Sequence, residues 1–267
     1  MRTTRAIVLA RGLGTRMRAA DPSAHLSPEQ QRAADAGLKA MIPLNGRPFL
    51  DYILSALADA GIRDAGLIVA PEHRALRHYY NTDSPPSRIR VDFIVQEHAL
   101  GTANAVLSAE TWVDGEPFLT MNADNLYPVE VLERLAELEE PGLPAFDRDD
   151  LIRSSNIPPE RVGSFAFLAV NQAGYLTQIV EKPADGIPTG NQISMNCWRF
   201  DDRIFGACRD VPRSARGEFE VPEAVGLAIR RGVAFKTFPA SGPVLDLSTR
   251  ADAADVARRL ADVSPKP

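Results

Sequence analysis

The stretch Leu9-Ala10-Arg11-Gly12-Leu13-Gly14-Thr15-Arg16-Met17 decides the organisation of this chain, because the rest of the sequence supplies partners to it. It follows the apolar run Ala6-Ile7-Val8-Leu9, which predicts a short buried strand. Two glycines then allow a tight turn and let backbone N–H groups approach an anion closely. Arg16 follows with a guanidinium fork that suits phosphate oxygens. A strand, a glycine loop and an arginine in this order favour a nucleoside triphosphate site, with an ordinary turn after a strand as the alternative.

The composition restricts the classes of protein to which the chain can belong. Its 267 residues are 45% hydrophobic and 24% charged, as in soluble globular proteins. The net charge of −5 supplies no overall positive field, so we expect no nucleic-acid partner. Cys197 and Cys208 form neither a disulfide framework nor a zinc pattern, and we expect two structural thiols. No apolar run approaches the ~18 residues of a membrane span or forms a signal peptide, so we expect a cytoplasmic protein without a membrane partner.

The first half of the chain alternates segments typical of strands with segments typical of helices. Short apolar runs predict strands at residues 6–9, 65–70, 91–95 and 117–121, and apolar residues at helical spacing predict helices over residues 50–60, 101–112 and 128–140. This alternation predicts an α/β fold with a doubly wound, mostly parallel central sheet. Such sheets bind ligands beyond the carboxyl ends of their strands. The glycine loop and Asp124, which both follow predicted strands, should therefore meet at one edge.

Two parts of the chain depart from this alternation. Residues 18–38 are polar and irregular, apart from a short helix capped by Ser27, and are expected to form a lid or a subunit interface of a homo-oligomer. After about residue 141 we expect a loop or lid over 147–159, a hairpin of 162–170 and 175–180, strands at 192–200 and 234–238, and helices over 220–231 and 249–260. This second, β-rich lobe is expected to be inserted on the same central sheet.

The glycine loop does not fit two common nucleotide-binding templates. It lacks the third glycine of the dinucleotide fingerprint, and the chain contains no GxxxxGK[ST] motif. The loop instead resembles the signature of sugar-1-phosphate nucleotidylyltransferases, the nucleotide-sugar pyrophosphorylases, in which Leu-Ala-small-Gly-x-Gly-Thr-Arg-hydrophobic precedes a lysine and a proline. Lys39 and Pro43 match that later part. Further matches follow in order at residues 96–103, 122–125, 161–163 and 181–183, and at Asn196 and Asp246, so the resemblance spans roughly residues 5–260.

The resemblance implies a fold, a reaction and a cofactor. The fold would be a Rossmann-like, GT-A-like nucleotidyltransferase domain over residues 1–267, with an inserted sugar-binding β-rich lobe. Its nucleotide-binding half would be residues 1–140, its sugar-phosphate-binding half 141–245, and its closing metal-ligand strand and C-terminal helix 246–267. A sugar phosphate oxygen would attack the α-phosphorus of a nucleoside triphosphate and expel pyrophosphate, with Mg²⁺ as cofactor. Because the nucleophile is already an anion, positioning and charge neutralisation must supply the rate.

The resemblance also implies a role for each matched residue. Arg16, Lys39 and Asp124 would be catalytic, the two cations neutralising phosphate charge and Asp124 sharing the Mg²⁺ with Asp246. The nucleotide-binding residues would be Leu9, Ala10, Gly12, Leu13, Gly14, Thr15, Gln96, Gly101 and Thr102, and the sugar-phosphate-binding residues Asn125, Gly163, Glu181, Lys182 and Asn196. Structural alternatives are a solvated surface position for Lys39 or Gln96, a turn at Asp124, a strand-edge position for Asp246, and an exposed ion pair between Glu181 and Lys182.

The sequence specifies the base of the nucleotide and the acceptor substrate less closely than it specifies the type of reaction. The amide of Gln96 can donate and accept, which suits the imide edge of uracil or thymine and favours UTP or dTTP. A cytidylyl- or guanylyltransferase acting on another sugar phosphate or a phosphonate, and a non-catalytic regulator that binds nucleotide sugars, are the alternatives. Arg11 and Ala123 depart from the family pattern, which has a small residue and commonly a glycine at these positions, and the gap between Arg16 and Lys39 is long. Arg11 is expected either to contact phosphate or to point away from it.

Overall fold

The computed structural model describes residues 2–12, 14–22, 24–181 and 191–267. Its strands are β1 (Arg5–Leu9), β2 (Pro43–Leu44), β3 (Arg47–Pro48), β4 (Asp64–Val69), β5 (Arg90–Val95), β6 (Phe118–Asn122), β7 (Asn125–Leu126), β8 (Gly142–Asp147), β9 (Ala166–Val170), β10 (Leu176–Glu181), β11 (Gln192–Ser194), β12 (Trp198–Phe200), β13 (Lys236–Ala240) and β14 (Leu245–Asp246). The strands predicted in the first half of the chain are all present.

The helices are distributed along the whole chain. They are α1 (Thr15–Arg18), α2 (Pro28–Asp35), α3 (Phe49–Asp59), α4 (Arg74–His78), α5 (Thr102–Leu107), α6 (Glu110–Val113), α7 (Val129–Glu137), α8 (Arg148–Ser154), α9 (Pro159–Val162), α10 (Arg203–Asp210), α11 (Val221–Arg230) and α12 (Asp252–Arg259), with a 3₁₀ turn η1 (Lys39–Met41) and a π turn η2 (Tyr79–Asp83). Ser27 caps α2 in a capping box with Gln30, as expected. None of the described helices is long and apolar enough to cross a membrane.

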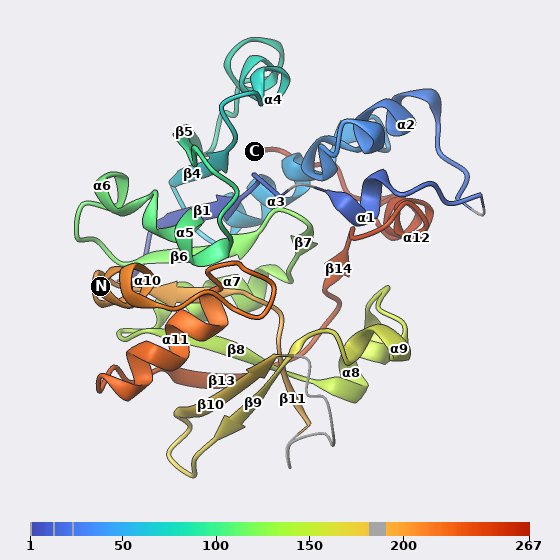
Figure 1. Ribbon diagram of the computed structural model, residues 1–267. Coiled ribbons are helices and arrows are strands. Elements are labelled where there is room, and N and C mark those ends of the chain that lie inside the picture. The colour runs from blue at the N-terminus through green and yellow to red at the C-terminus, as the bar shows by residue number, and fades with distance from the viewer. Residues whose placement is uncertain (1, 13, 23, 182–190) are drawn as a thin grey trace.

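One mixed sheet organises the molecule (Figure 1). Within the described residues it contains ten strands in the order β10-β9-β11-β8-β12-β6-β1-β4-β5, with β13 added beside β8. The neighbours β5, β4, β1 and β6 are parallel throughout, whereas β12, β11 and β10 run against the remaining strands. The prediction of a mostly parallel sheet is therefore confirmed, and its antiparallel members lie in the second lobe.

Helices cover both faces of this sheet, as the side chains of β1 show. Ala6 and Val8 belong to the core that α3 and α7 complete on one face. Ile7, between them, belongs to the core that α5, α10 and α11 complete on the other face. Successive side chains of a strand point to opposite faces, so an uninterrupted apolar run is what a strand buried on both sides requires. The doubly wound α/β prediction is confirmed.

Several segments differ from the sequence predictions. The helix expected over 101–112 is interrupted at residues 108–109 between α5 and α6, and the strand expected over 192–200 is interrupted where Asn196 has a φ of +57°. The expected loop or lid over 147–159 contains α8. No element was predicted for β8, whose Pro144 is atypical of a central strand, or for the short helix α10. These errors fall where a local signal is short or contradictory.

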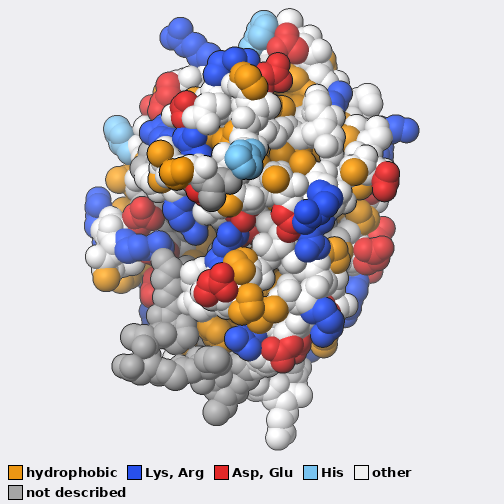
Figure 2. All heavy atoms as spheres, turned by 90° about the vertical axis from the view of Figure 1, so that its right-hand side faces the viewer, with side chains coloured by type: hydrophobic (Ala, Val, Ile, Leu, Met, Phe, Trp, Pro, Cys, Tyr) orange, Lys and Arg blue, Asp and Glu red, His pale blue; other side chains and the backbone are white. Residues whose placement is uncertain are grey.

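The face shown in Figure 2 carries basic and acidic side chains side by side. Arginine and lysine on this face are interspersed with aspartate and glutamate and do not form one continuous basic patch. This mixture matches the small negative net charge of the sequence.

Candidate functional site

The glycine loop leaves the sheet at the carboxyl end of β1 and enters α1 at Gly14. Gly14 has a φ of +62°, a left-handed conformation that favours glycine. A Cβ atom at this position would lie 2.6 Å from the carbonyl oxygen of Gly37. The start of α1 therefore packs directly on the chain that leads to Lys39, and only glycine fits there.

A buried arginine from the far end of the sequence holds the other end of α1. Arg250 donates from Nε to the carbonyl oxygen of Met17 (2.8 Å) and from Nη2 to that of Arg18 (3.0 Å). Its Nη2 also lies 2.7 Å from Oδ1 of Asp35, in α2, and this hydrogen bond lowers the pKa of Asp35. Cations near a helix C-terminus are stabilising. Arg250 thus fixes the helix that presents Arg16.

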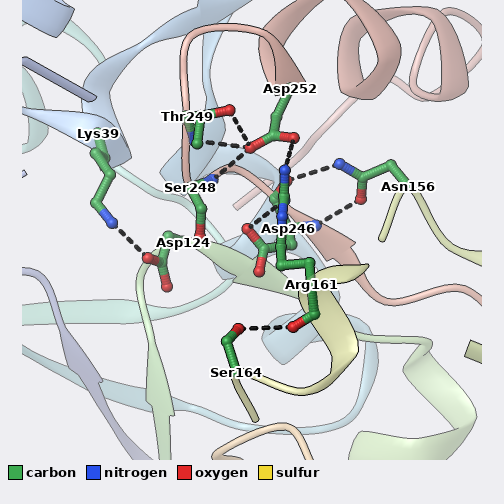
Figure 3. A network of polar contacts seen from close by, with 9 residues as sticks. All are labelled: Lys39, Asp124, Asn156, Arg161, Ser164, Asp246, Ser248, Thr249 and Asp252. Carbon is green, nitrogen blue, oxygen red and sulfur yellow. Dashed lines mark hydrogen bonds and ion pairs between the residues drawn. The ribbon is translucent and has the colours of Figure 1, made fainter. Parts of the chain in front are cut away.

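Lys39 and Asp124 form an ion pair across the carboxyl edge of the sheet (Figure 3). The 3₁₀ turn η1 presents Lys39, and Asp124 follows β6. Lys39 Nζ lies 2.6 Å from Asp124 Oδ2, and the two side chains are 17% and 19% exposed. The glycine loop and Asp124, which the sequence predicts to meet at one edge of the sheet, line one cavity there.

Asp246 lies beside this pair in a more enclosed position. It occupies β14, which pairs with β7 so that Asp246 stands opposite Asn125. Burial, together with the nearby Asp124 carboxylate, raises the pKa of Asp246 to about 6, although a hydrogen bond with Ser248 and the Arg161 charge act against this rise. Asn156 fixes its backbone: Asn156 Nδ2 donates to the carbonyl oxygen of Asp246 and the Asp246 N–H donates to Asn156 Oδ1, both at 2.7 Å.

Arg161 connects Asp246 to the closing helix α12. Its Nη1 lies 3.5 Å from Asp246 Oδ1, and its Nη2 donates to Asp252 Oδ1 at 2.7 Å. The second oxygen of Asp252 accepts from the backbone N–H groups of Ser248 and Thr249, and from the Thr249 hydroxyl. Residues 156–161, of which 156–159 belong to the expected loop or lid, therefore supply polar groups that support the Asp246 carboxylate.

Two cavities meet at this edge of the sheet. The first, of about 350 Å³, is lined by all the described residues predicted to bind nucleotide (Leu9, Ala10, Gly12, Gly14, Thr15, Gln96, Gly101 and Thr102) and by Arg16 and Lys39. The second, of about 320 Å³, is lined by Asn125, Asn196, Asp246, Ser164, Phe165, Met195, Arg216 and Ser248. Arg16, Asn122 and Asp124 line both cavities. The structure thus places a cation and a carboxylate where the two spaces join.

Two residues that line the first cavity, Gln96 and Gly101, are tightly constrained. Gln96 is 4% exposed, and its Nε2 donates to the carbonyl oxygen of Gly101 (3.1 Å) and to Asn104 Oδ1 (2.8 Å). Both N–H groups of this amide are occupied, so Gln96 presents an acceptor oxygen to a ligand and not both kinds of group. Gly101 has a φ of +109°, and a Cβ there would lie 2.4 Å from the Phe219 carbonyl oxygen. The backbone of Phe219, in the second lobe, thus packs directly on Gly101.

Some sequence-predicted residues are not placed in either cavity. Leu13 and Lys182 lie outside the described residues, as does the side chain of Glu181. Gly163 does not line the second cavity, whereas the next two residues, Ser164 and Phe165, do. The sequence analysis did not identify Asn156 or Arg216 as site residues, because neither stands next to a glycine loop or a strand end that would have marked it.

The two carboxylates fit a magnesium ion shared with a substrate. Within the described part of the chain no group of three acidic, histidine or cysteine side chains could hold a metal ion by itself. Burial and, second to it, the Asp124 charge raise the pKa of Asp246, so the two carboxylates repel when both are ionised, and a divalent cation between them would relieve this repulsion. Mg²⁺ is commonly held by one or two carboxylates plus substrate phosphates. The donor set therefore fits the Mg²⁺ that the family resemblance implies.

Comparison with known proteins gives one consistent result. A model of the nucleotidyl transferase family matches residues 5–247. The chain is 27% identical over 256 residues to the UTP–glucose-1-phosphate uridylyltransferase AglF of Haloferax volcanii, covering 96% of each protein. It is 27% identical over 254 residues to a glucose-1-phosphate thymidylyltransferase of Streptomyces griseus, covering 95% of this chain and 65% of that protein. Several other curated relatives are longer, and the chain spans 60% or less of their length.

The fold comparison agrees. The crystal structure of UDP-glucose pyrophosphorylase complexed with UDP-glucose superposes with a TM-score of 0.76 at 16% sequence identity, covering 98% of this chain and 100% of that one. At this identity the likeness shows the fold, including the mixed sheet and its helices, and no more than the fold.

Proposed function

This chain belongs to the nucleotidyl transferase family, and on that premise we propose that it transfers a nucleotidyl group from a nucleoside triphosphate to a sugar 1-phosphate, releasing pyrophosphate. The observation that carries the proposal is the junction of two cavities at Arg16, Asn122 and Asp124. A reaction that joins two phosphorylated substrates needs two adjacent spaces with charge-neutralising groups between them. A cytoplasmic location is part of this proposal, because nucleoside triphosphates and sugar 1-phosphates are cytoplasmic metabolites.

The first cavity is the proposed triphosphate site. The backbone N–H groups of Gly12, Gly14 and Thr15 and the Arg16 guanidinium would bind the phosphates, and Lys39 would neutralise charge as the reaction proceeds. UTP or dTTP is the favoured donor, because relatives are named for these nucleotides and because the Gln96 oxygen can accept from the N3–H of uracil or thymine. Cytosine also presents a donor to this oxygen, so CTP is the second candidate.

The second cavity is the proposed sugar phosphate site. Asn125 is 4% exposed, and among the described residues no group accepts a hydrogen bond from its Nδ2, which leaves a donor for a ligand. Asn196 and Arg216 line the same space and supply further polar and cationic groups. Gly163, Glu181 and Lys182 belong to this half of the site as proposals that rest on the family resemblance.

The chemistry follows from these positions. The acceptor phosphate is an anion and needs no protein base, so the side chains bind the two substrates in line and neutralise charge. Arg16 lines both cavities and would bind oxygens of the departing pyrophosphate near the reacting phosphorus. Asp124 and Asp246 would hold Mg²⁺, which when bound neutralises charge on the phosphates.

A donor-by-acceptor screen tests the proposal. The purified protein is incubated with Mg²⁺, each of UTP, dTTP, CTP and GTP, and glucose 1-phosphate, N-acetylglucosamine 1-phosphate or inositol 1-phosphate. We expect pyrophosphate release and a nucleotide-sugar mass with UTP or dTTP and a hexose 1-phosphate. Turnover with CTP alone selects the cytidylyltransferase alternative. Binding of nucleotide sugars by folded protein without any turnover refutes the enzyme and indicates the regulator.

A further inference from the structure

The proposed phosphate loop (residues 9–17) and the proposed base segment (residues 96–103) do not follow neighbouring strands of the sheet. The first follows β1 and the second follows β5, and β4 lies between these two strands. Neighbouring strands are about 4.8 Å apart, so the two segments are separated by roughly 10 Å. Each is fixed to β4 by one backbone hydrogen bond, from the Ala10 N–H to the Ile68 carbonyl (2.9 Å) and from the Gln96 N–H to the Val69 carbonyl (3.0 Å).

Arg11 connects the two segments directly across the end of β4. Its Nε donates to the carbonyl oxygen of Gln96 at 2.6 Å, and its Nη2 donates to that of Glu97 at 3.1 Å. Its side chain is half-buried and lines the first cavity. The small residue that the family pattern has at this position could not reach across β4. Neither of the two roles expected for Arg11, a phosphate contact or an orientation away from the site, describes these bonds.

We propose that Arg11 is a positioning residue that fixes the base segment relative to the phosphate loop, so that base and triphosphate are bound as one unit. The inference deepens the proposed function and rests on it. A ligand that occupies both segments gains from having their spacing set in advance, because less order is lost on binding. A ligand that occupies only one segment gains nothing. Arg11 should therefore strengthen the binding of a whole nucleotide and leave the binding of its triphosphate part unchanged.

Three variants separate this role from the alternatives. Arg11→Ala removes both hydrogen bonds. Arg11→Lys keeps the positive charge but lacks the guanidinium group, whose two nitrogens donate to two different carbonyl oxygens. Arg5→Ala is the matched control: Arg5 donates from Nη1 to the carbonyl oxygens of Trp112 (3.0 Å) and Val113 (2.8 Å), the same kind of contact at the other end of β1. Isothermal titration calorimetry measures the Kd of UTP, dTTP, CTP and inorganic tripolyphosphate for each protein.

We expect Arg11→Ala to raise the Kd of the preferred nucleotide about tenfold, to reduce the preference for UTP or dTTP over CTP by a similar factor, and to leave tripolyphosphate binding within about twofold. Arg11→Lys should show most of this loss, and Arg5→Ala should lower thermal stability without changing the preference. Equal weakening of nucleotide and tripolyphosphate, restored by Arg11→Lys, would mean a direct phosphate contact and would overturn the inference. Unchanged nucleotide binding would overturn it too. If the unmodified protein binds no triphosphate at all, the proposed function itself is refuted, and with it the role of Arg11 that rests on it.

Discussion

The Nζ atom of Lys39 lies 2.6 Å from Oδ2 of Asp124, and this ion pair stands beside the junction of the two cavities. The two residues are 85 positions apart in the sequence, and both side chains are largely shielded from water. Charges in such a place interact more strongly than on an open surface. In the proposed function, the carboxylate that would bind the metal would therefore also orient the Lys39 ammonium toward the phosphates.

Replacing Lys39 by methionine should remove that cation while preserving the length of the side chain. We expect Lys39→Met to lower kcat about 100- to 1,000-fold, because charge stabilisation in the transition state is lost. Pyrophosphate release measures the effect, and circular dichroism checks that the fold is retained. Lys236→Met is the control, since Lys236 lies over the ring of Tyr175 on the β9–β10 hairpin and donates to the Ala173 carbonyl oxygen. Equal activity of the two variants would show that Lys39 does not contribute to the reaction.

Sequence reasoning recovers the parts of the site that local patterns specify. Arg16 and Asp124 follow buried strands, and parallel strands bring their carboxyl ends to one edge, so their proximity is predictable. The support of Asp246 is not, because Asn156 lies 90 residues away and packs against β14 from a segment without periodic apolar pattern. Arg250 holds α1 across 233 residues. Such contacts depend on the complete fold, and neither side chain differs in the sequence from a solvated polar residue.

Gly14 and Gly12 offer a matched pair of substitutions in one loop. A Cβ at residue 14 would lie 2.6 Å from the Gly37 carbonyl oxygen and require a left-handed backbone, whereas a Cβ at residue 12 meets nothing within 4 Å. Gly14→Ala should destabilise the protein by about 2 kcal/mol or more, through strain and displacement of the 37–39 segment. Gly12→Ala should leave the free energy of unfolding unchanged or raise it by up to about 1 kcal/mol. Urea denaturation measures the stability of both variants. Equal unfolding midpoints would show that the left-handed backbone at residue 14 does not require glycine.

Asn156 should control magnesium affinity without touching the ion. Its amide makes both backbone hydrogen bonds that fix Asp246, so Asn156→Ala should weaken Mg²⁺ binding about 10- to 100-fold, as removal of a group that supports a metal ligand does. Calorimetric titration with Mg²⁺ and the nucleotide measures this affinity. Asn171→Ala is the control, because the Asn171 side chain also makes two hydrogen bonds with the backbone: its Oδ1 accepts from the N–H groups of Ala173 and Tyr175 in the β9–β10 turn. Both variants should lose stability, and an equal loss of Mg²⁺ affinity in both would contradict a specific role.

The raised pKa of Asp246 predicts how stability changes with pH when no Mg²⁺ is added. Burial and the Asp124 carboxylate raise this pKa from 3.8 to about 6, so between these values the folded protein holds a proton that the unfolded chain releases. Folding is then favoured at the lower pH. The free energy of unfolding that this group contributes falls as pH rises from 3.8 to about 6, and above about 6 it does not change further. The loss is about 2–3 kcal/mol at most. Asp35, whose pKa is lowered, acts in the opposite direction, so a variant is needed to isolate Asp246.

Asp246→Asn provides that variant, because asparagine resembles the protonated acid at every pH. In EDTA the variant should be more stable than the unmodified protein by about 1.5 kcal/mol at pH 5 and by about 3 kcal/mol at pH 8, where the unmodified protein carries two neighbouring negative charges. Added Mg²⁺ should stabilise the unmodified protein at pH 8 and have little effect on the variant, which should also have lost activity. Thermal unfolding at the two pH values measures both effects. A stability difference that is the same at pH 5 and pH 8 would show that Asp246 does not titrate in this range. The expected result would mean that the two carboxylates lower the stability of the metal-free protein and are retained because they bind the metal.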